Sequence, residues 1–243
     1  MKITLIMPTY NERANIGKMI DMLFLEYFPK INFAQMYLVV VDDNSPDGTA
    51  DVVRSRMTRY SNLSLLVGEK KGLGHAYVRG FKYSFDQIKP DAVIEMDADF
   101  QHNPVYLLTM ADLFRKGADY VICSRFIRGG SIPVSWEWYR KLLSYLGNRF
   151  ASFMLNLPNI HDVTTGFRLT RTRGIFENID LDSLMALDQF AFKVDLLYQT
   201  VKISRNIKEI PINFATREME QSKFNLMEII ATFKVIVRLW VAR

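Results

Sequence analysis

The chain has 243 residues, of which 49% are hydrophobic, and this is enough apolar material for one sizeable core. Its single cysteine excludes a framework of disulfide bonds and suits a reducing compartment. Since no apolar run reaches eighteen residues and the first one soon meets a proline, we expect neither a membrane-spanning helix nor a signal peptide.

Positive charge is concentrated in the middle of the chain. The net charge is +5, and residues 115–173 alone hold ten Lys or Arg against three Asp or Glu. A basic segment of this kind suits an anionic partner, so nucleic acid, a phosphorylated substrate and a membrane surface remain alternatives. A solvated basic face fits the same composition, and charge alone does not choose between them.

Strands and helices are expected to alternate through the first half of the chain. Apolar runs bounded by turn residues predict buried strands, and apolar residues at helical spacing predict helices between them. Because the runs are continuous and the connections short, the pattern favours an α/β domain with a doubly wound parallel sheet. The predicted strands are 3–8, 37–41, 63–67, 92–95 and 119–124, and the helices begin near Asn11 and Asp47 and cover 76–85 and 105–115.

The alternation loosens after residue 124, where a long loop precedes the remaining elements. This loop contains two adjacent glycines and a proline, and it is long enough to be functional rather than a plain connection. Beyond it the sequence predicts two helices, one strand and a terminal helix. Their expected ranges are 137–156, 189–201, 207–214 and 225–243.

The terminal helix has one apolar face that is interrupted by few charges. Ile229, Phe233 and Trp240 lie on this face at helical spacing. Two interpretations remain open. The helix either packs on its own domain or lies on an anionic lipid surface with Trp240 at the level of the headgroups.

Two carboxylates, Asp97 and Asp99, follow the predicted strand at 92–95 and are separated by one small residue. The carboxyl ends of the strands are where open α/β sheets bind their ligands. Carboxylate oxygens suit Mg²⁺, which commonly binds substrate phosphates at the same time. The pair is therefore a candidate metal site, although an Asp-x-Asp at a strand end also fits the solvated start of a loop.

Several other kinds of site are disfavoured by the residues present. The glycine-rich loop at 68–74 opens a helix, but Tyr77 stands where a dinucleotide fingerprint needs Gly or Ala. The sequence has neither the Gly-Lys-Ser/Thr of a P-loop nor the Gly-x-Ser-x-Gly of a nucleophile elbow. His75, His102 and His161 lack zinc-ligand spacing, so we interpret them as polar surface or loop residues.

Four predicted strands are each followed by a polar loop, and all four loops leave the same edge of a parallel sheet. They read Pro8-Thr-Tyr-Asn-Glu12, Val40-Val-Asp-Asp-Asn-Ser-Pro-Asp-Gly48, Lys71-Gly-Leu-Gly74 and Met96-Asp-Ala-Asp-Phe-Gln101. Together they resemble glycosyltransferase family 2, which implies a GT-A type, Rossmann-like and mostly parallel sheet. The finer resemblance is to polyprenol (dolichol) phosphate mannose synthases. It adds Cys123-Ser-Arg-Phe126, Trp138-Tyr-Arg-Lys-Leu142, Asp162-Val-Thr-Thr-Gly-Phe-Arg168, Phe192-Lys193 and Thr216-Arg217 through Ser222-Lys223.

The resemblance implies a donor site built from the four loops. Asp99 and Gln101 match cation ligands for Mg²⁺ or Mn²⁺, and Asp97 matches a contact to the nucleotide sugar or a support for the metal through water. Ala98 lies between the two carboxylates. The positions that match the nucleoside pocket are Pro8, Tyr10, Glu12, Val41 and Asp43, and those that match basic residues on the donor side are Lys193 and Arg217.

An acceptor site is implied in the basic segment. Arg125 and Arg140, with Ser144 nearby, match residues that hold the acceptor phosphate. Arginine side chains suit this role because their planar fork matches phosphate oxygens. A phosphate monoester is largely dianionic at neutral pH, so we expect the acceptor to need no dedicated general base.

The implied reaction moves mannose from GDP-mannose to a polyprenyl or dolichyl monophosphate with inversion, and Asp99, Arg125 and Arg140 carry it. One alternative keeps the fold but uses UDP-glucose or another sugar nucleotide. Another is a non-catalytic, nucleotide-binding, membrane-associated subunit. Binding of nucleic acid is least favoured, because no recognised module accompanies the basic segment.

The resemblance and the charge pattern also predict an organisation and a location. We expect residues 1–220 to form the GT-A domain and residues 221–243 to form an amphipathic C-terminal helix at the membrane interface. The protein is expected to be cytoplasmic and peripheral at the membrane surface. A small membrane-anchoring subunit is a further candidate partner.

Overall fold

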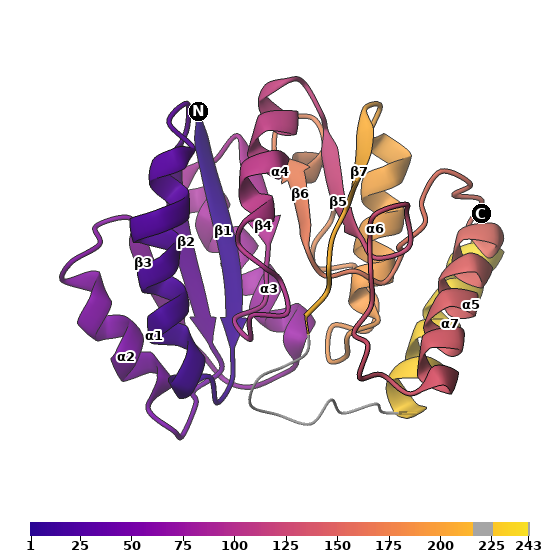
Figure 1. The fold of residues 1–243 in the computed structure, drawn as a ribbon, viewed down its shortest axis with the longest axis horizontal. Coiled ribbons are helices and arrows are strands. Elements are labelled where there is room, and N and C mark those ends of the chain that lie inside the picture. Colours follow the sequence, from indigo (N-terminus) through magenta and orange to yellow (C-terminus); the bar gives the residue numbers. More distant parts are fainter. Residues whose placement is uncertain (216–225, 243) are drawn as a thin grey trace.

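The structure is a computed structural model, and it describes residues 1–215 and 226–242. A seven-stranded sheet runs through the molecule with helices on both faces (Figure 1). The strands are β1 (Lys2–Thr9), β2 (Gln35–Asp42), β3 (Leu63–Val67), β4 (Ala92–Glu95), β5 (Tyr120–Ser124), β6 (Arg168–Arg171) and β7 (Ile207–Pro211). The α-helices are α1 (Arg13–Met22), α2 (Thr49–Met57), α3 (Leu73–Tyr83), α4 (Tyr106–Arg115), α5 (Trp138–Met154), α6 (Phe192–Ile203) and α7 (Leu226–Val241).

The strand order is β3-β2-β1-β4-β6-β5-β7, and the pairs β1–β2, β1–β4, β2–β3 and β5–β7 are parallel. Among the strands of the described residues, only β6 runs antiparallel, and it does so to both of its neighbours, β4 and β5. The predicted α/β class with a doubly wound, mostly parallel sheet is confirmed. The sequence had not indicated a strand at β6.

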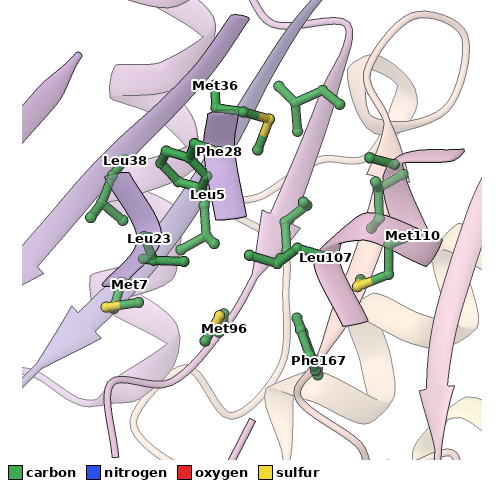
Figure 2. Packing of buried hydrophobic residues seen from close by; sticks show 14 of the residues in the cluster. Leu5, Met7, Leu23, Phe28, Met36, Leu38, Met96, Leu107, Met110 and Phe167 are labelled. Atoms are coloured by element: carbon green, nitrogen blue, oxygen red, sulfur yellow. The ribbon is translucent and has the colours of Figure 1, made fainter. Parts of the chain in front are cut away.

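The two faces of the sheet bury alternate residues of the same strands. Leu5 and Met7 of β1 pack against α1 and α4, whereas Ile6 packs against α3 and α6. Figure 2 shows the first of these cores, in which Leu5, Met7 and Leu38 meet residues from the helices and turns, such as Leu23, Phe28, Leu107 and Met110. Burial on both faces explains why the parallel strands read as continuous apolar runs.

Helix α7 packs on its own chain but leaves much apolar surface uncovered. It lies beside α5 (Figure 1) and also contacts α6, and its buried residues are Ala231, Val235, Ile236 and Leu239. The face that the sequence picked out, with Ile229, Phe233 and Trp240, is 40–52% exposed. Among the described residues, no helix has the length and apolar character needed to cross a membrane.

Candidate active site

A cavity of about 370 Å³ opens at the carboxyl ends of β1, β2 and β4, where the first, second and fourth loops leave the sheet. Residues of the third, glycine-rich loop line one side of the cavity. The lining residues are Pro8, Thr9, Tyr10, Glu12, Asp43, Lys70, Gly72, Leu73, Ala76, Asp97, Ala98, Asp99, Gln101, His102, Arg125, Thr164, Thr165, Gly166, Phe190 and Phe214.

The loops after β1 and β2 are tied together by side-chain caps. Backbone N–H groups of Asn11 and Glu12 donate to the hydroxyls of Ser45 and Thr49, each at 3.0 Å. Asp43 accepts from Arg79 at 2.6 Å, and burial raises the pKa of its carboxyl although Arg79 opposes the shift. The ammonium of Lys70 lies 3.3 Å from the ring centroid of Tyr10. This end of the cavity therefore combines an aromatic ring, a carboxyl group and an ammonium group.

Gly72 is required by its surroundings. Its φ is +122°, and a Cβ atom at this position would lie 2.4 Å from the Cα of Asp188. Any larger residue would push the basic glycine-rich loop away from that backbone.

The Asp97–Asp99 segment is held from both sides. The Tyr77 hydroxyl donates to Asp97 Oδ1 at 3.2 Å, and burial together with the charge of Asp97 raises the pKa of Tyr77, so the donor proton stays in place. Asp99 Oδ1 accepts the backbone N–H of Gln101 at 3.1 Å across Phe100, whose φ is +63°. The turn thereby brings two carboxylates and an amide side chain to one wall of the cavity.

These residues suit a cation that is shared with a substrate. Among the described residues, no group of three His, Cys, Asp or Glu side chains is close enough to hold a metal ion by itself. Asp97, Asp99 and Gln101 instead supply a few hard oxygen atoms beside open space. Mg²⁺ is usually bound in this way, with one or two carboxylates and with substrate phosphates and water completing its shell.

Arg125 is clamped at the edge of the cavity. Its Nε and Nη2 donate to Asp162 at 2.7 and 2.6 Å, and Nη2 also donates to the Thr164 hydroxyl at 2.8 Å. Within residues 1–215 and 226–242, Nη1 makes no hydrogen bond. The clamp thus fixes the guanidinium and leaves one pair of N–H donors for an anionic ligand.

A second, mostly apolar groove of about 530 Å³ lies between α5 and α7. Arg140 and Ser144 line it, and the Arg140 guanidinium lies 3.8 Å from the ring centroid of Trp136. Thr164 and Phe190 line both this groove and the polar cavity, so the two spaces adjoin. A ligand with an anionic head and an apolar tail matches this pair of spaces.

A buried charged cluster lies below the floor of the cavity. Lys193, fully buried, donates to Glu95 at the end of β4, and Arg168 of β6 donates to the Lys193 carbonyl at 2.7 Å. Burial lowers the pKa of Lys193, and the charge of Glu95 opposes this effect. Lys193 does not line the cavity, so it supports the cavity floor from below.

Most of the predicted site residues come together. Arg140 and Ser144 line the groove rather than the cavity, whereas Val41 is buried in β2 and Lys193 below the floor. Arg217 lies outside the described residues. The predicted residues that line the cavity are Pro8, Tyr10, Glu12, Asp43, Asp97, Ala98, Asp99, Gln101 and Arg125.

Several lining residues had not been predicted from the sequence. His102 lies in a loop, as interpreted, but it is not a surface residue, because its side chain is 2% exposed and forms part of the cavity wall. Thr164 and Gly166 belong to a motif that carried the resemblance, but nothing in the sequence alone showed that they face the donor loops. Lys70 and Gly72 lie in the basic glycine-rich loop, which was an available signal.

The sequence profile of Glycosyl transferase family 2 matches residues 4–178. The chain belongs to this family. It is therefore a glycosyltransferase. The matched segment includes every lining residue of the cavity except Phe190, which precedes α6, and Phe214, which follows β7.

Curated relatives match over nearly the whole chain. An undecaprenyl-phosphate mannosyltransferase of Micrococcus luteus is 35% identical, covering 93% of this chain and 88% of its own. A polyprenol monophosphomannose synthase of Mycolicibacterium smegmatis is 34% identical, covering 95% and 84%. A dolichol-phosphate mannosyltransferase of Pyrococcus furiosus is 31% identical, covering 98% of this chain and 64% of its own.

Solved structures share the fold at lower identity. Glucosyl-3-phosphoglycerate synthase of Mycobacterium tuberculosis, crystallised with Mn²⁺, UDP and phosphoglyceric acid, superposes with a TM-score of 0.63 at 15% identity, over 99% of this chain and 78% of that one. Mannosyl-3-phosphoglycerate synthase of Rubrobacter xylanophilus gives 0.57 at 17% identity, over 100% and 74%. Both comparisons support a GT-A type fold.

Proposed function

We propose that this protein transfers mannose from GDP-mannose to a polyprenyl monophosphate, with inversion at the anomeric carbon. The observation that carries the proposal is the junction at Thr164 and Phe190 between a polar cavity and an apolar groove. An acceptor with a phosphate head and a prenyl tail has the chemistry of both spaces. The names of three relatives at 31–35% identity support mannose as the transferred sugar and a polyprenyl-type phosphate as the acceptor.

The chain's residues would act mainly by placement and by charge. Asp99 and Gln101, with Asp97 beside them, would hold Mg²⁺ or Mn²⁺, which stabilises the negative charge of the departing diphosphate when bound. The Nη1 edge of Arg125 would hold the acceptor phosphate against the anomeric carbon, and Arg140 would approach it from the groove. Fixed donors of this kind lower the barrier without a proton transfer, and the dianionic phosphate is already nucleophilic.

The donor is the finer part of the proposal, and UDP-glucose is its rival. We expect GDP-mannose with Mg²⁺ or Mn²⁺ to raise the melting temperature of the protein, because a ligand that binds only the folded state stabilises it in proportion to its affinity. UDP-glucose at the same concentration should produce a smaller shift. A larger shift with UDP-glucose would contradict GDP-mannose as the donor and would make UDP-glucose the proposed donor.

We further propose that the protein is peripheral at the cytoplasmic surface of a membrane. Helices α5 and α7 lie together at one end of the molecule (Figure 1). They line the groove and expose large apolar side chains. We call this the apolar face, and its members are Trp138, Tyr139, Leu142, Leu143, Leu146, Phe150, Phe153, Leu226, Met227, Ile229, Ile230, Phe233 and Trp240. Contiguous apolar surface of this extent marks a protein or membrane interaction site.

The apolar face predicts binding to lipid vesicles that contain anionic lipid. The double substitution Trp138→Glu and Phe153→Glu should reduce co-sedimentation with such vesicles at least ~10-fold, since each buried aromatic side chain contributes about 1.5–3 kcal/mol. Met57→Glu, on α2 at the far end of the sheet, is the matched control (Figure 1). Equal binding by the double variant and the control would contradict a membrane role for this face. If the parent chain fails to bind vesicles alone, a membrane-anchoring subunit becomes necessary.

A further inference from the structure

His102 is a buried side chain in the cavity wall to which the proposed reaction gives no role. It is 2% exposed, and its ring stacks on Phe167 at 5.0 Å between centroids and meets Phe214 at 5.7 Å. Burial lowers the pKa of the imidazole, in spite of the nearby charges of Asp97 and Asp99.

The position of the imidazole proton follows from the backbone. The N–H of Asp97 donates to His102 Nδ1 at 3.1 Å, and an amide N–H can only be a donor. Nδ1 is consequently unprotonated, and the proton lies on Nε2. The distance of 3.7 Å from Nδ1 to Asp97 Oδ2 is too long for a competing hydrogen bond.

Among residues 1–215 and 226–242, no acceptor forms a hydrogen bond with the Nε2–H group. The Nε2 atom is also not fully enclosed by that part of the chain. The empty space that the ring lines is the cavity. A ligand that closes off the cavity over this N–H without supplying an acceptor would leave a buried donor unpaired, at a cost of about 1–3 kcal/mol, so the N–H is suited to a ligand that supplies an acceptor.

The surroundings of His102 identify which part of a ligand that is. A Cβ atom on Gly166 would be in ordinary contact with His102 Cε1 at 3.5 Å, Lys193 Cε at 3.7 Å and Asp97 Oδ2 at 3.8 Å, so this glycine borders a space that has a donor on one side and an acceptor on the other. A sugar hydroxyl both donates and accepts, and it fits such a pair. Phosphate oxygens only accept and would be repelled by the Asp97 carboxylate.

The location agrees with this chemistry. His102 is a neighbour of both ends of the site. Its ring accepts the backbone N–H of Asp97, and Phe214 contacts both its ring and the Arg125 guanidinium, which lies 5.4 Å from the Phe214 centroid. With the donor diphosphate at the carboxylates and the acceptor phosphate at Arg125, the transferred sugar must lie between them.

We propose that the Nε2–H of His102 donates a hydrogen bond to a hydroxyl group of the transferred hexose, while its Nδ1 holds the Asp97 backbone in place. This inference rests on the proposed function and adds a sugar-contacting residue to it. The two ring nitrogens have separate tasks, and each is separately testable.

His102→Asn separates the two tasks, because the Asn oxygen can replace Nδ1 as the acceptor while nothing replaces Nε2–H. We expect this variant to bind GDP as the parent does and to bind GDP-mannose about 3- to 10-fold more weakly, the loss typical of one hydrogen bond. In a series of monodeoxy GDP-mannose donors, one donor should bind parent and variant equally, since its missing hydroxyl is the partner of Nε2. His75→Asn, which does not line the cavity, is the control.

A variant that weakens GDP and GDP-mannose equally, or that loses the same factor with every deoxy donor, would overturn the contact. If His102→Asn does not fold, Gly166→Val places a branched side chain in the same space and should weaken GDP-mannose but not GDP. Failure of the parent to use GDP-mannose would instead count against the proposed function. Binding of UDP and of UDP-glucose would then be compared between the parent and His102→Asn. The proposed contact still requires that the variant lose more affinity for the sugar nucleotide than for the free nucleotide.

Discussion

Asp99→Asn is expected to reduce glycosyl transfer by about 100- to 1000-fold while the protein stays folded. The carboxylate would supply a charged oxygen to the cation that neutralises the leaving diphosphate, and removal of one such electrostatic contact has effects of this size. The Asn side chain keeps an oxygen that can accept the Gln101 N–H, so the turn around Phe100 is retained. The measurement is the initial rate of transfer at saturating metal, alongside the melting temperature.

Asp51→Asn is the matched control for this variant. Asp51 is an exposed acid on α2 that pairs with Arg54 on its own helix, and it does not line the cavity. We expect its rate to equal that of the parent. Full activity of Asp99→Asn, or an equal loss in both variants, would contradict the assignment of Asp99 to the donor site.

Lys193→Met is expected to lower the free energy of unfolding by about 3–5 kcal/mol, because it leaves Glu95 charged and unpaired in the interior. Both side chains are almost completely inaccessible, at 0% and 2%, and Glu95 Oε1 already lacks a partner among the described residues. The free energy is measured by urea unfolding. Glu95→Gln should cause a loss of similar size by stranding the ammonium group.

The double variant Lys193→Met with Glu95→Gln tests whether the two charges act as a pair. It should be clearly more stable than the sum of the single losses predicts, since no unpaired charge remains. Strictly additive losses would show that the pair has no coupling. A Lys193→Met variant that keeps its stability but loses nucleotide binding would restore Lys193 to the donor-side role that the resemblance implies.

The strands that could be predicted from the sequence, such as β1 and β2, have both of their faces buried among apolar side chains. Strand β6 was missed because it begins with Arg168, which is fully buried and donates to two backbone carbonyls, and because Thr170 and Arg171 interrupt any apolar run. Burial of that arginine depends on α6 and on the loop before β6. The contact to α6 joins residues 25 positions apart, so it is not visible in the local sequence.

Helix α7 shows a different limit. Its apolar periodicity predicted a helix with one strongly apolar face, and a helix is present. Its buried side is formed by Ala231, Val235, Ile236 and Leu239, which are offset from the face marked by Phe233 and Trp240. Periodicity locates apolar surface, but it does not state which neighbour covers that surface.

The site was largely predictable because four strand–loop junctions converge once a parallel sheet is assumed. His102 was not, although it lies three residues from Asp99. Its proposed role depends on a hydrogen bond from a backbone N–H and on aromatic neighbours from the residue before β6 and from the segment after β7, which come together only in the folded chain. Likewise, the clamp on Arg125 joins residues 37 and 39 positions apart.

The central claim is that a sugar is moved from a nucleotide in the polar cavity to a phosphate whose prenyl tail occupies the apolar groove. It is tested most directly by incubating the purified protein with a short polyprenyl phosphate, Mg²⁺ or Mn²⁺ and a panel of sugar nucleotides, and by identifying the lipid product by mass spectrometry. We predict polyprenyl phosphate mannose from GDP-mannose. Product from UDP-glucose alone would contradict the proposed donor, and no lipid-linked sugar from any donor would support the non-catalytic alternative.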